Sequence, residues 1–184
     1  VGKTYISNIL KKMGFSVFSS DQVSKKIVSE NTFVRDQIRE FFGEDIIEND
    51  KISREKLAIQ VFSNRKKLKK LNEIVHPFVK KEFDKWMSNR YDEKVVFKEA
   101  AILFEANSQK NLDYVVCVSA KLQDRINRVM QRDKVDSDSV EKRISMQMPQ
   151  NEKEKLSDFV ILNSKDDLVL PQIIKVLKKI FDLQ

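Results

Sequence analysis

Val1-Gly2-Lys3-Thr4-Tyr5-Ile6-Ser7-Asn8-Ile9-Leu10 is the stretch of sequence that decides the fold. Its Gly-Lys-Thr triplet is the last part of the phosphate-binding motif G-x-x-x-x-G-K-S/T and stands directly before an amphipathic helix. One face of that helix is apolar: Ile6, Ile9, Leu10 and Met13. In such a loop, backbone N–H groups wrap phosphates, the lysine reaches their oxygens and the threonine hydroxyl holds Mg²⁺. An ordinary helix start is the alternative, because three residues recur by chance.

An acidic residue follows the first predicted strand. The run Phe15-Ser16-Val17-Phe18 predicts a strand that ends in Ser19-Ser20-Asp21. Ligands of open α/β sheets collect at the carboxyl ends of strands. A carboxylate there can accept a proton from an attacking hydroxyl or help to place Mg²⁺. The alternative is that Asp21 caps the helix that follows it.

Strands and helices alternate along most of the chain. Residues 22 to about 90 show helical patterns almost throughout, with a further helix expected to begin at Pro77. Strands are expected at 95–97, 114–118 and 159–162, and helices at 122–132, at 137–148 and at the end of the chain. This order predicts a parallel sheet with right-handed crossovers. We expect residues 1–27 and 93–184 to form a nucleotide-binding core with a lid at roughly 120–150, and 28–92 a helical insertion.

Composition excludes several classes of protein. The 184 residues carry a net charge of +7, but basic and acidic residues are interleaved and no nucleic-acid-reading motif is present. No apolar run approaches the roughly 20 residues that cross a bilayer, so no membrane partner is expected. Cys117 is the only cysteine, which rules out a disulfide within the chain and fits a reducing cytoplasm.

Two further features have competing interpretations. Arg125, Arg128 and Arg132 recur at helical spacing, which suits a phosphate clamp but equally a solvated face. His76 is the only histidine, and a lone histidine beside apolar residues is commonly structural. No metal-ligand cluster can be built around it, so the only metal expected is Mg²⁺ carried by a nucleotide.

A series of motifs in a fixed order spans nearly the whole chain. Ser19-Ser20-Asp21 lies where one family has D-A-D, and residues 43–57 are similar to its G-x-x-I-L-x-x-x-G-x-I-D-R-x-x-L segment. Two further matches lie in the helical region: Val61-Phe62-Ser63-Asn64 corresponds to V-F-x-D/N, and Leu71-Asn72-Glu73-Ile74-Val75-His76-Pro77 corresponds to L-N-x-I-x-H-P. In the second half of the chain, Ile102-Leu103-Phe104-Glu105 corresponds to P-L-L-F-E and residues 128–133 correspond to R-x-M-x-R-D. Arg143-Ile144 with Gln147 corresponds to R-I-x-x-Q, and residues 158–163 correspond to D-x-V-I-x-N. The sequence resembles the dephospho-coenzyme A kinase family.

The resemblance implies a fold and a reaction. The fold is a P-loop NTPase-type α/β fold, with a parallel sheet flanked by helices, a helical substrate-binding insertion and a lid. The reaction is transfer of the γ-phosphate of ATP to the ribose 3′-hydroxyl of dephospho-CoA, which gives coenzyme A. The implied cofactors are ATP, as co-substrate, and Mg²⁺. The implied partners are dephospho-CoA and ATP, and the implied location is the cytoplasm. A monomer or small homo-oligomer is expected.

The resemblance also implies roles for single residues. Asp21 is expected to act as general base, Lys3 to hold phosphate and Arg132 to meet the transferring phosphoryl group, while Thr4 holds Mg²⁺ through ATP. The other residues expected to bind nucleotide are Gly2, Arg128 and Asn163. Those expected to bind or adjoin dephospho-CoA are Lys25, Arg54, His76, Leu103, Phe104 and Glu105.

The sequence departs from the family pattern at several positions. Ser19 replaces an acidic residue, Lys25 an arginine, Ala101 a proline and Lys165 a glycine. Most of the glycine loop, and a strand expected in the middle of the sheet, would precede Val1, so we expect the 184-residue chain not to catalyse at a useful rate. The alternatives are another nucleotide or nucleoside kinase of the same fold, a truncated inactive nucleotide-binding module, and a basic nucleic-acid binder.

Overall fold

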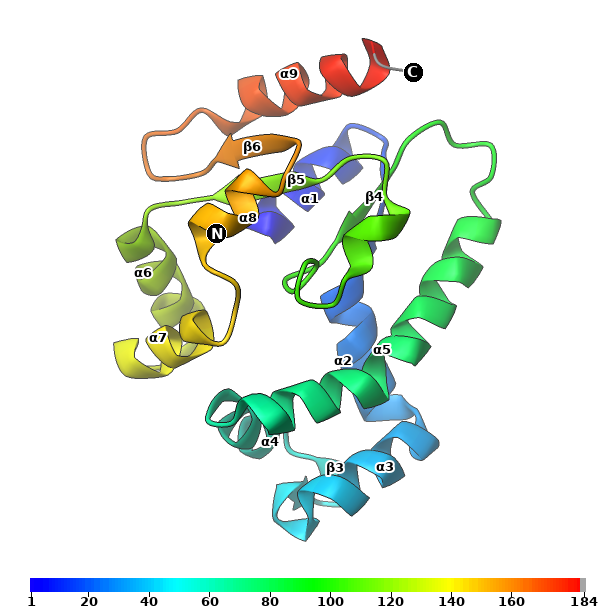
Figure 1. Cartoon of the computed structure of the whole chain (residues 1–184), viewed down its shortest axis with the longest axis vertical. Coiled ribbons are helices and arrows are strands. Elements are labelled where there is room, and N and C mark those ends of the chain that lie inside the picture. The colour runs from blue at the N-terminus through cyan, green and yellow to red at the C-terminus, as the bar shows by residue number, and fades with distance from the viewer. Residues whose placement is uncertain (183–184) are drawn as a thin grey trace. The chain divides into compact units, whose positions relative to one another are not determined.

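The computed structural model describes residues 1–182, which form two compact units. One unit contains Val1–Ile9 and Ile102–Gln184, and the other contains Leu10–Ala101. Figure 1 shows the elements in chain order: α1 (Lys3–Lys12), β1 (Ser16–Ser19), α2 (Ser20–Glu30), α3 (Thr32–Phe42), β2 (Ile47–Glu48), β3 (Lys51–Ile52), α4 (Arg54–Phe62), α5 (Arg65–Ser88), β4 (Val96–Glu99), β5 (Val116–Ser119), α6 (Leu122–Asp133), α7 (Ser137–Ser145), α8 (Gln150–Lys155), β6 (Phe159–Leu162) and α9 (Val169–Asp182).

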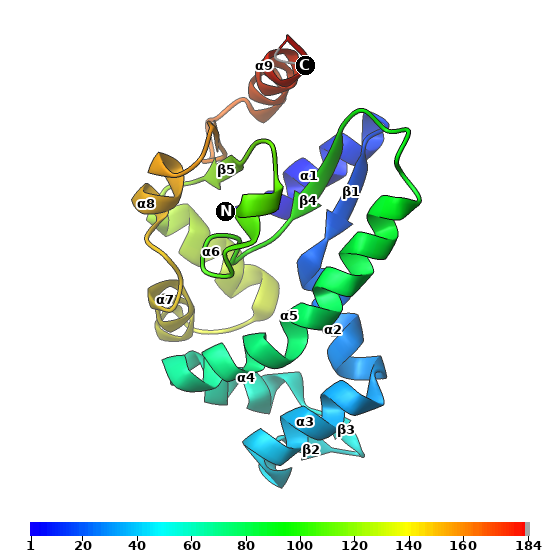
Figure 2. The ribbon, with the colours of Figure 1, turned by 45° about the vertical axis from the view of Figure 1, so that its right-hand side comes forward.

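The Leu10–Ala101 unit combines a small parallel sheet with four helices. Strand β1 pairs with β4 in parallel, in the register Ser16 with Val96 to Ser19 with Glu99. Figure 2 shows these two strands side by side. Phe18 of β1 contacts Phe83 and Trp86 of α5 edge to face, with ring centroids 5.1 and 5.6 Å apart. These ring contacts bind the long helix to the sheet.

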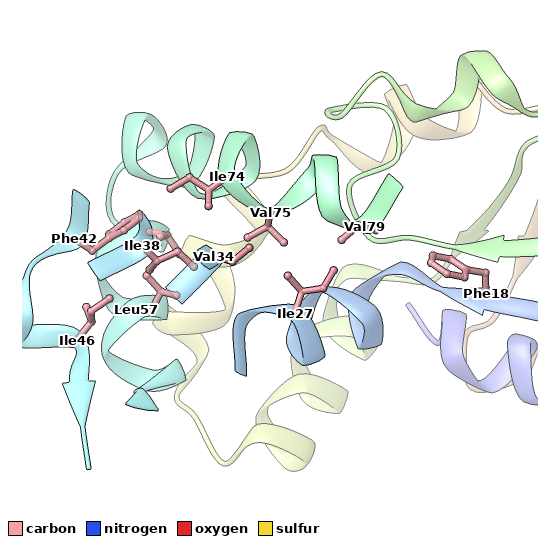
Figure 3. Packing of buried hydrophobic residues seen from close by; sticks show 11 residues of the cluster. Phe18, Ile27, Val34, Ile38, Phe42, Ile46, Leu57, Ile74, Val75 and Val79 are labelled. Carbon is pink, nitrogen blue, oxygen red and sulfur yellow. The ribbon is translucent and has the colours of Figure 1, made fainter. Parts of the chain in front are cut away.

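One apolar cluster holds the helices of this unit together. Ile27 of α2 lies against Val75 and Val79 of α5, as Figure 3 shows. The cluster continues through α3 and α4 with Val34, Ile38, Phe42, Leu57 and Val61. Val34 and Ile38 are fully buried, one turn apart on α3, as its amphipathic pattern requires.

Helix α5 corrects one expectation from the sequence. Pro77 does not begin a further helix; it lies inside a single helix of 24 residues, Arg65–Ser88. A proline inside a helix removes one backbone hydrogen bond and costs about 3 kcal/mol. Val75 and Val79 are buried on either side of Pro77 in the same cluster, so tertiary packing keeps the helix continuous.

The other unit contains the second parallel pair. Strand β5 pairs with β6 in the register Val116 with Phe159 to Ser119 with Leu162. Helix α9 covers β6, and its buried face contains Val169, Ile173, Leu177 and Ile180. Helices α6 and α7 contact each other, and α8 contacts β5. The parallel strand pairing and the flanking helices predicted from the sequence are confirmed.

The segment after α7 differs from its prediction. The helix expected over 137–148 ends at Ser145, and a short helix, α8, follows at Gln150–Lys155. Pro149 disfavours helical geometry in the residue before it. The N–H of Met148 donates to a carboxylate oxygen of Glu105 at 2.8 Å instead of continuing the helix.

The two units are groups of contacting residues, and the expected core, lid and helical insertion stay predictions. β1 and β4, expected within the nucleotide-binding core, group with the helices of 10–101. The described strands form three separate two-stranded sheets, of which β2 and β3 make a short antiparallel hairpin. Within residues 1–182, every helix is too short or too polar to cross a membrane.

Candidate functional site

The loop before α1 is bound to the end of β6. Gly2 has a φ of +92°, a conformation that glycine adopts without steric cost. A Cβ at this position would lie 2.0 Å from Nδ2 of Asn163, so any other residue here would have to displace that side-chain amide. The same Nδ2 donates a hydrogen bond to the carbonyl oxygen of Val1 at 2.9 Å. Asn163 is buried and therefore fixes the loop where α1 begins.

Basic side chains surround this loop. Lys3 is the first residue of α1, where backbone N–H groups lack helical partners and favour anions. Arg128 adds a second positive charge beside the loop, with its Nη1 3.8 Å from where a Cβ on Gly2 would stand. The loop therefore lies in a positive potential that suits phosphate.

A pocket of about 560 Å³ opens beside the loop. Gly2, Arg128 and Asn163, all expected to bind nucleotide, line it together. The remaining walls are Tyr5, Ser164, Lys165, Asp167, Leu168, Val169, Leu170 and Pro171. A mixed apolar and polar pocket of this size is typical of small-molecule sites. Tyr5 and the Leu168–Pro171 segment were not among the residues predicted from the sequence, because no motif marks them.

The three arginines of α6 bind three different partners. Arg128 donates from Nη1 to the backbone oxygen of Asn163 at 2.7 Å, which makes it part of the pocket wall. Arg125 donates from Nη1 to Gln150 at 3.1 Å, and its Nε is buried without a hydrogen-bond partner. Arg132 contacts its neighbour Asp133. The spacing correctly placed them on one helix, and their joint binding of phosphate stays a prediction.

Glu105 links the segment after β4 to the region around α8. Its Oε1 accepts a hydrogen bond from the Met148 N–H at 2.8 Å and pairs with Nζ of Lys153 at 2.9 Å. Leu103 and Phe104 lie in the turn before it, where their backbone oxygens accept hydrogen bonds from Ser108 and Asn107. Glu105 therefore has partners inside its own unit, and its expected place beside the acceptor stays a prediction.

Asp21 lies in the first turn of α2, in the Leu10–Ala101 unit. Strand β1 ends at Ser19, which is also the N-cap residue of α2. The alternative interpretation of Asp21 as the N-cap is therefore wrong. Lys25 follows Asp21 by one helical turn, so both side chains project from the same face of α2.

His76 and Arg54 occupy helices of the same unit. Arg54 is the exposed first residue of α4. His76 is half-buried on α5, and burial, followed by the charge of Lys98, lowers its pKa below the ordinary value. Lys98 lies on β4 with its Nζ 4.2 Å from the ring centroid of Phe83. Sequence reasoning missed Lys98, although a charged residue directly after the apolar run Val95–Phe97 was a visible signal.

Mg²⁺ has chemically suitable oxygen donors in this chain. The hydroxyl of Thr4 stands in the first turn of α1, and the carboxylate of Asp21 stands in the first turn of α2. Oxygen ligands of this kind suit Mg²⁺, which usually keeps several waters and binds through one or two side chains plus phosphates. In the part of the chain that the structure describes, no group of three or more His, Cys, Asp or Glu residues forms a metal cluster.

Comparisons with known proteins give one consistent result. The model of a family described as dephospho-CoA kinase matches residues 1–168. A dephospho-CoA kinase of Bacteroides fragilis is 32% identical over 176 residues, covering 96% of this chain and 86% of the relative. A crystal structure from Thermus thermophilus superposes with a TM-score of 0.82 at 28% identity, covering 97% of this chain and 91% of that one. A dephospho-CoA kinase structure from Campylobacter jejuni has a TM-score of 0.67, with the same identity and coverage.

Proposed function

The chain belongs to the dephospho-CoA kinase family, and from this premise we propose how its residues divide the work of the reaction. The reaction is ATP-dependent phosphorylation of dephospho-CoA, which yields coenzyme A and ADP. The protein is a transferase of a phosphoryl group to an alcohol. Positioning and charge stabilisation account for most of the catalysis in this class of chemistry.

The nucleotide is proposed to bind in the pocket beside the Gly2 loop. The observation that carries this proposal is that Gly2, Arg128 and Asn163 line one pocket of about 560 Å³ at the start of α1. The adenosine would occupy the part formed by Tyr5 and the Leu168–Pro171 segment. The phosphates would extend toward the N–H groups at the start of α1 and toward Lys3, the positively charged first residue of that helix.

Phosphoryl transfer is proposed to use one base, two cationic side chains and Mg²⁺. The ribose 3′-oxygen attacks the γ-phosphorus, the bond from that phosphorus to the β,γ-bridging oxygen breaks, and ADP leaves. Asp21 accepts the hydroxyl proton. Lys3 and Arg132 neutralise the charge on the phosphoryl oxygens. Mg²⁺, when bound with ATP and Thr4, supplies further neutralisation of the phosphate charge.

The acceptor is proposed to bind through the helices of the Leu10–Ala101 unit together with the segment after β4. Dephospho-CoA carries a diphosphate, which cationic side chains favour. Lys25 and Arg54 are exposed cations on α2 and α4, and the half-buried ring of His76 can donate a hydrogen bond. Leu103 and Phe104 are proposed to adjoin the acceptor, and Glu105 is proposed to hold that turn through Met148 and Lys153.

The cellular location and the oligomeric state of the enzyme are also proposed. We propose that the enzyme works in the cytoplasm, where its single cysteine, the buried Cys117, stays reduced. We propose a monomer or a small homo-oligomer as the active form.

A substrate panel tests the proposed function. The full-length enzyme with Mg²⁺-ATP should phosphorylate dephospho-CoA, and the product should carry the new phosphate at the ribose 3′ position. Adenosine, AMP and other nucleosides should be poor acceptors. Preference for a nucleoside would favour another kinase of the same fold, and ATP binding without turnover of any acceptor would favour an inactive nucleotide-binding module.

A further inference from the structure

Asp133 stands where a helix disfavours negative charge. It is the last residue of α6, and the C-terminal end of a helix carries a partial negative charge that repels carboxylates. Lys134 follows in the left-handed conformation and ends the helix. An acidic residue at this position therefore requires compensating contacts.

Two arginines supply that compensation. Arg132 donates from Nε to Oδ1 at 2.7 Å and from Nη2 to Oδ2 at 3.0 Å, and Arg143 of α7 donates from Nη1 to Oδ2 at 2.9 Å. The hydrogen bonds from Arg132, and then those from Arg143, hold the pKa of Asp133 below its usual range against the opposing effect of burial. The carboxylate is thus shared between two helices of the predicted lid.

The contact with Asp133 leaves one edge of the Arg132 guanidinium available to bind a ligand. Its side chain is 72% exposed, whereas those of Asp133 and Arg143 are 26% and 29% exposed. A guanidinium has five N–H donors, and Asp133 takes two of them from the edge formed by Nε and Nη2. Among the described residues, the Arg132 side chain forms no other hydrogen bond. The opposite edge, formed by Nη1 and Nη2, remains open to a planar fork of phosphate oxygens.

We propose that Asp133 and Arg143 are positioning residues for phosphoryl transfer, which fix the Arg132 guanidinium with its open edge toward the nucleotide phosphates. This inference rests on the proposed role of Arg132. Asp133 holds one edge of the guanidinium, and Arg143 holds the Asp133 carboxylate from α7. Fixing a long side chain before the reaction lowers the entropy lost in the transition state.

The contact pattern distinguishes this role from simple sequestration. A carboxylate that withheld Arg132 from the nucleotide would slow the enzyme, and its removal would raise activity. A positioning carboxylate has the opposite effect, because its removal lets the exposed side chain of Arg132 rotate freely. The sign of the change in kcat therefore separates the two roles.

The test is a double-mutant cycle in the full-length enzyme. Asp133→Asn should lower kcat about 10-fold while the KM for ATP changes less than about 3-fold, since misplacement of a catalytic group acts on the transition state. Arg143→Gln should lower kcat in the same way, whereas Arg143→Lys, which keeps the charge and a donor, should retain most of it. In an Arg132→Ala background, Asp133→Asn should change kcat less than about 2-fold, because its effect passes through Arg132.

Three outcomes would overturn the inference. The first is an unchanged or raised kcat in Asp133→Asn. The second is that Asp133→Asn lowers kcat equally in the wild type and in the Arg132→Ala background. The third is that kcat falls only in proportion to a loss of thermal stability. Normal turnover in Arg132→Ala itself would instead remove the proposed role of Arg132 on which the inference rests. The single and double variants thus distinguish the two failures.

Discussion

The side-chain amide of Asn163 donates a hydrogen bond to the backbone oxygen of Val1 at 2.9 Å, across 162 positions of the chain. The same amide nitrogen lies 2.0 Å from where a Cβ on Gly2 would stand. One buried side chain at the end of β6 therefore fixes the loop before α1, and it would have to move to admit a Cβ at Gly2.

Gly2→Ala should weaken ATP binding strongly, with the KM for ATP rising about 10-fold or more, since uniform binding of the phosphates is lost. The new methyl group would displace Asn163 and with it the bond to Val1. Gly14→Ala is the matched control. Gly14 has a similar φ of +94°, but among the described residues only its own chain neighbours lie within 4 Å of where its Cβ would stand. That control should lose about 1–2 kcal/mol of stability with an unchanged KM. Equal KM values in both variants would contradict this account of the loop.

Asp21→Asn should lower kcat by about 10²–10⁴-fold, since it removes the proposed general base for the 3′-hydroxyl proton. Binding of ATP, measured by calorimetry, should change little because Asp21 does not line the pocket proposed for the nucleotide. Asp36→Asn, an exposed change on α3 of the same unit, is the control and should be neutral. Near-normal turnover in Asp21→Asn would show that another group accepts the proton.

Arg132→Lys should lower kcat by more than it raises the KM for ATP. Lysine keeps the positive charge but loses the planar fork, so it cannot bind Asp133 with one edge and phosphate with the other. Steady-state kinetics at saturating dephospho-CoA measure both constants. A change confined to the KM for ATP would make Arg132 a residue of ground-state binding.

His76 should make the enzyme less stable in mild acid. Burial and the charge of Lys98 place the pKa of its folded form below the ordinary value of 6.5. As the pH falls below about 6.5, the unfolded chain takes up a proton that the folded chain resists, so the free energy of unfolding decreases. The decrease should be complete once the pH is below the folded pKa.

Urea unfolding at pH 7.5 and pH 5.5 measures this effect in the wild type and in His76→Gln. The variant should lose less stability between the two pH values than the wild type, because glutamine does not titrate. An identical pH dependence in both proteins would show that other groups cause the acid sensitivity. Lys98→Met should raise the pKa of His76, which NMR titration of its ring protons can follow.

The sequence predicted those parts of the fold that depend on local pattern. Ile6 and Leu10 at helical spacing placed α1, and the apolar runs placed β5 and β6 within two residues. Pro77 misled the interpretation, since its local effect on a helix is outweighed by the burial of Val75 and Val79 around it. Whether that burial exists depends on α2, which local pattern cannot show.

The site was predicted less completely than the fold. The family motifs predicted that Gly2, Arg128 and Asn163 bind nucleotide, and in the structure all three line one pocket. The contacts of Arg132 with Asp133, and of Asp133 with Arg143, were not predicted, although all three residues lie within quoted motifs. A motif records which residues recur, whereas a hydrogen bond depends on side-chain direction, which becomes visible only in three dimensions.

The ring contacts of Trp86 give the protein an internal optical reporter. Trp86 is the only tryptophan of the sequence, and it lies against Phe18 and under the guanidinium of Arg90, 4.2 Å from the ring centroid. Its fluorescence therefore senses the junction of β1 and α5 within the Leu10–Ala101 unit. Far-ultraviolet circular dichroism senses helices of both units. If the denaturation curves from the two signals coincide, the two units unfold together. If the curves differ, the two units unfold independently of each other.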